Sequence, residues 1–146
     1  MTDTSNDLAA ELTALTRVVS QCLIDKKATH IRVLKLNGLV SYCDRVIICT
    51  GNSSRHVRAI AESVIQASKK HGVQPLGVEG QGVDQWILID LNDIIIHVFD
   101  PEFRPNYDLD SLWVTAPEIT LESIGLDLPE STDIDPDSDD EPFFLL

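Results

Sequence analysis

The sequence predicts a two- to three-layer α/β sandwich in which helices pack against a mixed five-stranded sheet. Apolar residues recur at helical spacing in two long segments, and five shorter segments have the composition of β-strands. The order along the chain is α-β-β-α-β-β-β-α, and mixed helix and strand segments of this kind are typical of α/β folds. The chain has 146 residues, of which 43% are hydrophobic, so we expect one domain with one core.

A long helix and two strands are predicted in the N-terminal third. The helix ends near Lys26 and Lys27, whose charges suit a helix C-terminus. Residues 29–36 follow as a strand closed by an Asn-Gly turn, and residues 45–50 form a strand apolar enough to be central. The apolar stripe of the helix consists of Leu8, Leu12, Leu15, Val18, Val19 and Cys22.

The second helix is predicted after a Gly-Asn-Ser-Ser turn, with Ser53 or Ser54 as its N-cap. Gly72 ends it, since glycine adopts the left-handed conformation without strain. Residues 75–79 then form a short strand, expected at a sheet edge because it contains Pro and Gly. The stripe of this helix consists of Val57, Ile60, Ala61, Val64 and Ile65.

The last two strands form a hairpin with Asn92 and Asp93 at its turn, because Asn and Asp tolerate positive φ. Alternation places Trp86, Leu88 and Asp90 on one face, and Ile87, Ile89 and Leu91 on the other. The return strand runs over residues 94–99. A face that carries both a Trp and a carboxylate is expected to stay open near its turn end, because a fully buried carboxylate is costly.

A final helical segment follows the hairpin. Pro101 suits a first helical position, and Pro105 is expected to break the helix. Asn106 or Asp108 can cap a last turn. Leu112 and Trp113 on this turn are expected to cover the sheet. Trp86 could also be a core residue, because the face that it occupies includes Leu88.

Charge divides the chain into a domain, residues 1–116, and an acidic, disordered C-terminal tail, residues 117–146. The domain has 11 basic and 14 acidic residues, a net charge of −3, whereas the tail has ten acidic residues and no basic one. The tail ends in the apolar run 143–146, which could dock on a partner or fold back. A nearly neutral domain lacks the basic surface of proteins that bind nucleic acid directly, so no DNA partner is expected.

Several classes of site are not supported. The three cysteines are odd in number without a Cys-x-x-Cys pair, and the four histidines are dispersed, so we predict buried free thiols, no metal and no cofactor. The acidic N-terminus and the lack of a long apolar run predict a cytoplasmic protein with no membrane segment. Combinations of Ser, His and Asp lack the G-x-S-x-G elbow of a catalytic serine.

The turn T-G-N-S-S-R-H-V, residues 50–57, has three possible roles. It could be a capped strand-to-helix turn, a partner contact, or an anion site built from backbone N–H groups at a helix start. It lacks the spacing of a P-loop, and no acidic residue follows until Glu62 to hold Mg²⁺. The candidate residues are Asn52, Ser53, Ser54, Arg55 and His56.

Three blocks in register carry a family resemblance. They are D-R-V-I-I-C-T-G-N-S-S-R-H-V at 44–57, P-L-G-V-E-G at 75–80, and W-I-L-I-D-L-N-D-I-I-I-H-V-F at 86–99 followed by Y-D-L-D-S-L-W. The chain resembles the ribosomal silencing factor family, also called RsfS or Iojap, over residues 7–114. It departs from the pattern at Asn92 (usually Gly), at Asp110 (usually Glu) and at Pro105, and residues 117–146 have no counterpart.

The resemblance implies a topology related to nucleotidyltransferases and a role without catalysis. It implies binding to the large ribosomal subunit through the protein numbered fourteen in the universal naming, which blocks joining of the small subunit and lowers translation in stationary phase or starvation. Homodimers of the free protein are also implied. The contact residues matched to the hairpin block are Trp86, Asp90, Leu91, Asn92, Asp93 and Phe99.

Two other functions stay open on the sequence alone. A nucleotide-binding or nucleotidyltransferase-like enzyme would use the turn at residues 50–57. An adaptor would recruit a second protein through the acidic tail, residues 117–146.

Overall fold

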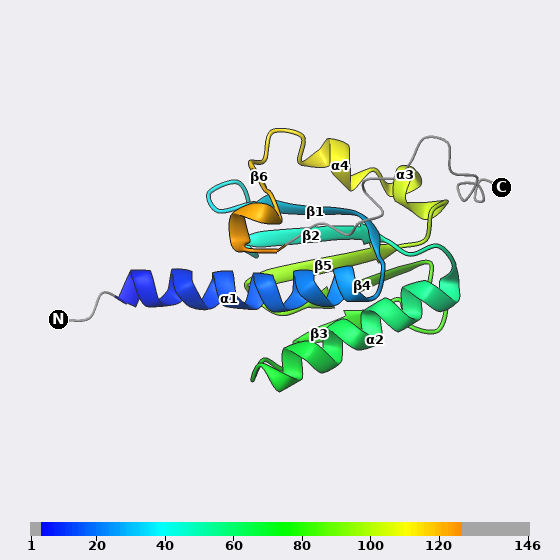
Figure 1. Ribbon diagram of the computed structural model, residues 1–146. Coiled ribbons are helices and arrows are strands. Elements are labelled where there is room, and N and C mark those ends of the chain that lie inside the picture. The colour runs from blue at the N-terminus through cyan, green and yellow to red at the C-terminus, as the bar shows by residue number, and fades with distance from the viewer. Residues whose placement is uncertain (1–3, 127–146) are drawn as a thin grey trace, which may run out of the picture.

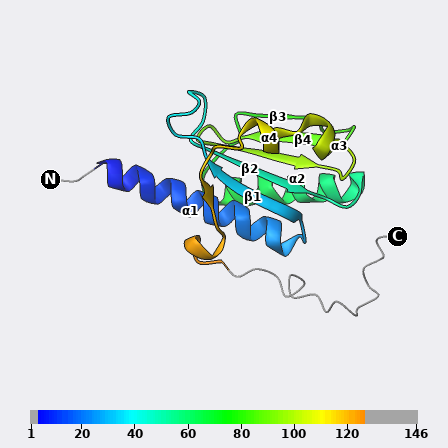
Figure 2. The ribbon, with the colours of Figure 1, turned by 90° about the horizontal axis from the view of Figure 1, so that it is seen from above.

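The computed structural model describes residues 4–126 as one mixed sheet with helices on both faces (Figure 1). The helices are α1 Thr4–Asp25, α2 Ser54–Lys70, α3 Phe103–Tyr107 and α4 Leu109–Leu112, and a 3-10 turn η1 spans Glu122–Ile124. The strands are β1 Thr29–Lys35, β2 Arg45–Thr50, β3 Gly77–Glu79, β4 Trp86–Asp90, β5 Ile94–Phe99 and β6 Glu118–Ile119. The long helices α1 and α2 cover one face, and the short α3 and α4 lie over the other (Figure 2).

The sheet has six strands in the order β3-β4-β5-β2-β1-β6. β2 and β5 are parallel, and the other neighbouring strands are antiparallel. The predicted α/β class, the mixed sheet and the five predicted strands are therefore confirmed. β2 is buried at every position because it is central and covered on both faces.

The sixth strand corrects the predicted domain boundary at residue 116. Glu118 pairs with Leu34 and Ile119 with Val33 at the edge of β1. Leu121 and Leu126 are then buried in the core beneath the sheet. The acidic composition suggested disorder from residue 117, but the apolar residues spaced along 117–126 are enough to pack this segment onto the domain. Residues 127–146, including the apolar end at 143–146, lie outside the described residues.

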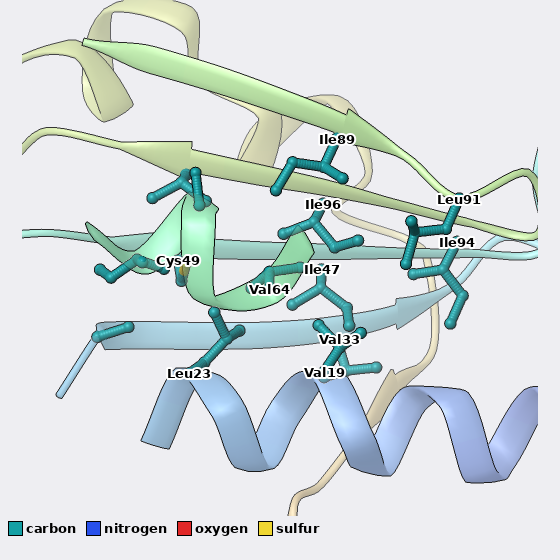
Figure 3. Packing of buried hydrophobic residues seen from close by; sticks show 14 of the residues in the cluster. Val19, Leu23, Val33, Ile47, Cys49, Val64, Ile89, Leu91, Ile94 and Ile96 are labelled. Carbon is teal, nitrogen blue, oxygen red and sulfur yellow. The ribbon is translucent and has the colours of Figure 1, made fainter. Parts of the chain in front are cut away.

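The main core fills the space between the sheet and the two long helices. Figure 3 shows Val19 and Leu23 of α1 and Val64 of α2 directed at the sheet. The facing strand residues include Val33, Ile47, Cys49, Ile89, Leu91, Ile94 and Ile96. Both helices pack on the sheet through most residues of the stripes that their sequences predicted, but Leu8, at the start of the α1 stripe, is 64% exposed.

The second cluster lies on the opposite face, under α3 and α4. Trp113 is buried there, as predicted, against Leu34, Val46 and Ile48 of the sheet. Leu112 was predicted to cover the sheet as well, but it is 65% exposed. Neighbouring residues of a helix point about 100° apart, so a one-turn helix that buries Trp113 directs Leu112 to solvent.

Pro105 lies inside α3, so the prediction that it breaks the helix is wrong. α3 has five residues, and Pro105 is its third. The first N–H groups of a helix have no partner within the helix, so a proline costs no hydrogen bond there. Asp108 caps the next helix as predicted, since its side chain accepts a hydrogen bond from the N–H of Ser111.

Candidate partner-binding site

The outer face of β4 is the part of the sheet that α3 and α4 leave partly open. Trp86, Leu88 and Asp90 are half-buried, and they alternate with the fully buried Ile87 and Ile89. This confirms the alternation expected from the sequence. We call the set formed by Trp86, Leu88, Asp90, Asn92 and Asp93 the β4 surface.

Trp86 is held against the sheet by aromatic packing and by a hydrogen bond. Its backbone lies opposite Phe99 on β5, and its ring stacks on that of Phe99 with centroids 5.1 Å apart. Its indole N–H donates to Nδ1 of His97 at 3.0 Å. Trp86 is thus an aromatic residue in a defined orientation that still reaches solvent, which is the character of an interface anchor.

The hairpin turn carries the polar end of the β4 surface. Asn92 has a φ of 78°, as expected for the residue placed at this turn. Its N–H donates to Oδ1 of Asp90 at 2.8 Å, so the Asp90 side chain shapes the turn. The carbonyl of Asp93 accepts from the N–H groups of Asp44 and Arg45, which fastens the turn to the start of β2. The side chains of Asn92 and Asp93 are exposed.

Two of the six predicted contact residues are buried. Phe99 has no exposed surface and Leu91 has 3%. Leu91 belongs to the core on the helix side, because the regular register of β4 against β5 leaves it on the face opposite Trp86. Phe99 shares the outer face with Trp86 but lies in the cluster under α3 and α4. We therefore remove both side chains from the contact surface and assign them to packing.

The sequence interpretation missed two apolar neighbours of Asp90. Ile95 lies opposite it on β5 and is half-buried. Leu76, before β3, is 69% exposed, and its N–H donates to the carbonyl of Asp90. Alternation along β5 could have identified Ile95, whereas the position of Leu76 depends on strand pairing, which the sequence does not state.

A groove of about 650 Å³ borders the turn on the side of α1. Apolar side chains of α1, including Leu8 and Leu12, line it together with the carboxylates of Glu11, Asp44 and Asp93. No Lys or Arg is among its lining residues within the described part of the chain. The turn end of the molecule is therefore acidic as well as apolar.

Burial sets the protonation of the groups behind the β4 surface. The pKa of His97 falls to about 4 because the charged imidazolium would lose its solvation. A neutral His97 can accept the indole hydrogen bond through Nδ1. Burial raises the pKa of Cys49 to about 12 and that of Cys43 to about 11, so both are inert thiols as the sequence predicted.

The turn at residues 50–57 has the geometry of a capped strand-to-helix connection. Ser53 Oγ accepts from the N–H of His56. His56 Nδ1 accepts from the N–H of Asn52 at 2.9 Å, and its Nε2 donates to the carbonyl of Lys26 at 2.7 Å. The hydroxyl of the cap and both ring nitrogens therefore bind the protein itself. Ser54 and Arg55 are exposed.

Nothing in the described residues resembles a metal site or a membrane span. Between residues 4 and 126, no group of three or more His, Cys, Asp or Glu side chains is arranged to hold a metal ion. Over the same range, none of the helices combines the length and the apolarity that crossing a bilayer requires.

Comparison with known proteins gives consistent matches. Residues 9–142 match the sequence model of the family described as "Ribosomal silencing factor during starvation". A ribosomal silencing factor from Haemophilus influenzae is 38% identical over 100 residues, which cover 68% of this chain and 98% of that protein. The mouse "Mitochondrial assembly of ribosomal large subunit protein 1" is 31% identical over 94 residues, 62% of this chain and 41% of that protein. A crystal structure from Chromobacterium violaceum is 36% identical with a TM-score of 0.68, covering 69% of this chain and 84% of that one.

Proposed function

The chain belongs to the ribosomal silencing factor family, and from this premise we propose that it binds the large ribosomal subunit and prevents the small subunit from joining. The proposed contact on the subunit is the protein numbered fourteen in the universal naming. The mechanism is occlusion: the bound factor occupies surface that the small subunit needs. Translation falls as a result, in stationary phase or starvation, without a catalytic step.

The observation that carries the proposal is the outer face of β4, which has the half-exposed Trp86 at one end and a polar turn at the other. Aromatic anchors at the centre of an interface, surrounded by a polar rim, supply most of the binding energy of typical complexes. Trp86 provides such an anchor, and Asp90, Asn92 and Asp93 provide the rim. Leu88 adds apolar surface between Trp86 and Asp90, and Ile95 and Leu76 add apolar surface beside Asp90.

Charge supports a basic protein partner. Residues 1–126 contain 11 basic and 16 acidic residues, a net charge of −5, so the domain has no net positive charge to attract the phosphates of RNA. The carboxylates of Asp90 and Asp93 suit Arg or Lys side chains on a ribosomal protein, and a partner of opposite charge is steered toward the surface.

Replacing the anchor tests the proposal. We expect Trp86→Ala to fold and to lose affinity for purified large subunits by about 30-fold or more, because a central aromatic contact is removed. Co-sedimentation and a binding titration measure the loss, and circular dichroism checks the fold. Gln66→Ala is the control, since it truncates an exposed side chain of α2, which covers the opposite face of the sheet. Equal co-sedimentation of Trp86→Ala and the control would refute the assignment.

The enzymatic alternative now has little support. The capping of the turn uses Ser53 Oγ, both ring nitrogens of His56 and the N–H groups of Asn52 and His56, and the relatives are named as silencing factors. Titration of the protein with nucleotides and Mg²⁺ by calorimetry should give no heat of binding; a signal lost in Arg55→Ala would instead favour the enzyme.

A further inference from the structure

His97 makes a diagonal contact with Trp86 across β4 and β5. Trp86 lies opposite Phe99, and His97 is two residues before Phe99, so the two side chains share the outer face. The bond from the indole N–H to His97 Nδ1 is 3.0 Å long, and the ring centroids are 5.8 Å apart. Diagonal pairs on a sheet are within reach of aromatic side chains, so this contact is a normal unit of sheet packing.

The donor and acceptor of this bond are fixed by chemistry. An indole N–H can only donate, so Nδ1 of His97 must accept and cannot carry a proton. His97 is therefore neutral, with its proton on Nε2. Its 6% exposure is consistent with a neutral ring.

His97 is itself rigidly placed. Its ring lies nearly parallel to that of Phe99, with centroids 6.1 Å apart and an interplanar angle of 10°. The ring of Trp113, the residue that follows α4, lies at a centroid distance of 6.2 Å from the His97 ring and is tilted by 49° to it. The His97 ring thus contacts one aromatic ring of β5 and one that follows α4. Trp86 is only partly buried against the same cluster.

We propose that His97 is a positioning residue for the partner contact: it holds the indole of Trp86 in the orientation that the partner meets, without touching the partner itself. This inference rests on the proposed role of Trp86 in binding the large subunit. A half-exposed tryptophan has several rotamers open to it, and each must be frozen on binding. Fixing one rotamer in the free protein lowers that cost and strengthens binding.

Two substitutions at residue 97 separate the hydrogen bond from the packing. His97→Asn keeps an acceptor, because Oδ1 of Asn occupies the same place in the side chain as Nδ1 of His. His97→Phe keeps the ring and its stacking but removes the acceptor. His71→Phe is the matched control, since His71 is an exposed residue beyond the C-terminus of α2.

The first readout reports the indole directly and does not depend on the ribosome. The chain has two tryptophans, so a ¹H–¹⁵N spectrum contains two indole N–H signals, and Trp86→Phe identifies the one from Trp86. In wild type and His97→Asn we expect this proton to be protected from exchange with water. In His97→Phe its exchange should be about tenfold faster, since a lost hydrogen bond is worth about that factor.

The second readout is affinity for purified large subunits. We expect His97→Phe to bind about five- to tenfold more weakly, and His97→Asn and His71→Phe to bind as wild type does. In a Trp86→Phe background the indole N–H is gone, so His97→Phe should cause no further loss. Comparing the effect of His97→Phe in the two backgrounds is a double-mutant cycle, and it separates the loss caused by the indole hydrogen bond from any other effect of residue 97.

The outcomes distinguish the two proposals. Wild-type affinity of His97→Phe, or an equal loss in the Trp86→Phe background, overturns the positioning role. So does a protected Trp86 proton in a His97→Phe variant that binds weakly. If Trp86→Ala binds large subunits as tightly as wild type, the proposed function is overturned instead, whatever exchange rate is measured for the Trp86 indole N–H.

Discussion

Arg45 is a buried cation that makes no ion pair among the described residues, although the nearby carboxylate of Asp44 favours its charged form. It begins β2, is 9% exposed, and donates from Nη1 to Thr16 Oγ1 of α1 at 2.8 Å. Its Nε is buried without a hydrogen-bond partner in the described part of the chain. Burial lowers the pKa of Arg45, although the guanidinium stays charged. A buried charge that is incompletely paired costs stability, because its lost hydration is not replaced.

We therefore expect Arg45→Met to raise the free energy of unfolding by about 1 kcal/mol. Methionine fills much of the space of the arginine stem, and Thr16 keeps a partner because its hydroxyl donates to the carbonyl of Leu12. Urea unfolding measures the change, with Arg17→Met as an exposed control expected to shift it little. A clear loss of stability in Arg45→Met would show that the arginine is net favourable where it lies.

The sequence predicted which face of the sheet each hairpin side chain occupies better than it predicted how far that side chain is exposed to solvent. Alternation placed Trp86 and Asp90 on one face and Leu91 on the other, and the structure agrees. Alternation could not show that Phe99, on the same face as Trp86, lies beneath another element. Whether a face is covered depends on where a later part of the chain folds back, and that information is not local.

At the scale of elements, α3 and α4 cover part of the sheet face that carries the proposed contact surface. They are too short to be stable alone, so contacts with the sheet must hold them. Asp110 of α4 accepts from Arg104 Nη2 at 2.9 Å and from Arg32 Nη1 of β1 at 2.8 Å. Arg104 also donates to Thr50 Oγ1 at 2.9 Å at the end of β2. Hydrogen bonds from Arg104 and then Arg32 lower the pKa of Asp110 to about 2.

Asp110→Asn should loosen this cover. We expect a loss of about 1 kcal/mol in the free energy of unfolding at neutral pH, together with faster hydrogen exchange in residues 103–116. Because the pKa of Asp110 is lowered in the folded state, its contribution is fully present above the unfolded pKa of about 3.9 and disappears as the pH falls toward 2.

The difference between wild type and Asp110→Asn should therefore shrink in acid. Glu62→Gln, at an exposed position on α2, is the control and should leave exchange in residues 103–116 unchanged. A difference between wild type and Asp110→Asn that persists at pH 2 would argue against the charge network as its cause.

Long elements were predictable and short ones were not. The stripes of α1 and α2 and the apolar run of β2 each carry many residues of one pattern, so their predicted ranges agree with the structure. β6 has two residues and α4 has four, and such lengths contain only about one period of a strand or helix pattern. Their existence is decided by tertiary contacts, such as the hydrogen bond from Lys35 N–H to the carbonyl of Pro117 that leads into β6.

At the scale of the whole molecule, the sheet separates the larger core from the proposed contact surface. One face is covered by α1 and α2 and contains the larger core, whereas the other carries the β4 surface beside a small cover. The hairpin of β4 and β5 contributes residues to both faces. The C-terminal segment lies at the far edge of the sheet, where β6 pairs with β1.

Truncation at two points tests how far the domain extends. Removing residues 127–146 takes away eight acidic residues and should leave both stability and large-subunit binding unchanged. Removing residues 117–146 also removes β6 and the buried Leu121 and Leu126, and it exposes the edge of β1. Burial of two leucine side chains is worth about 3–6 kcal/mol, so we expect a large loss in the free energy of unfolding, measured by urea denaturation.

Sedimentation with large subunits then separates the possible roles of the C-terminal segment. If the shorter truncation lost binding while its stability was intact, residues 127–146 would be part of the contact and an adaptor role would gain support. If instead the longer truncation kept full stability, the packing of residues 117–126 would be dispensable and the boundary at residue 116 would be correct. Retained binding after the first cut, with destabilisation after the second, is the result expected of a domain that ends near Leu126 and recognises its partner through the β4 surface.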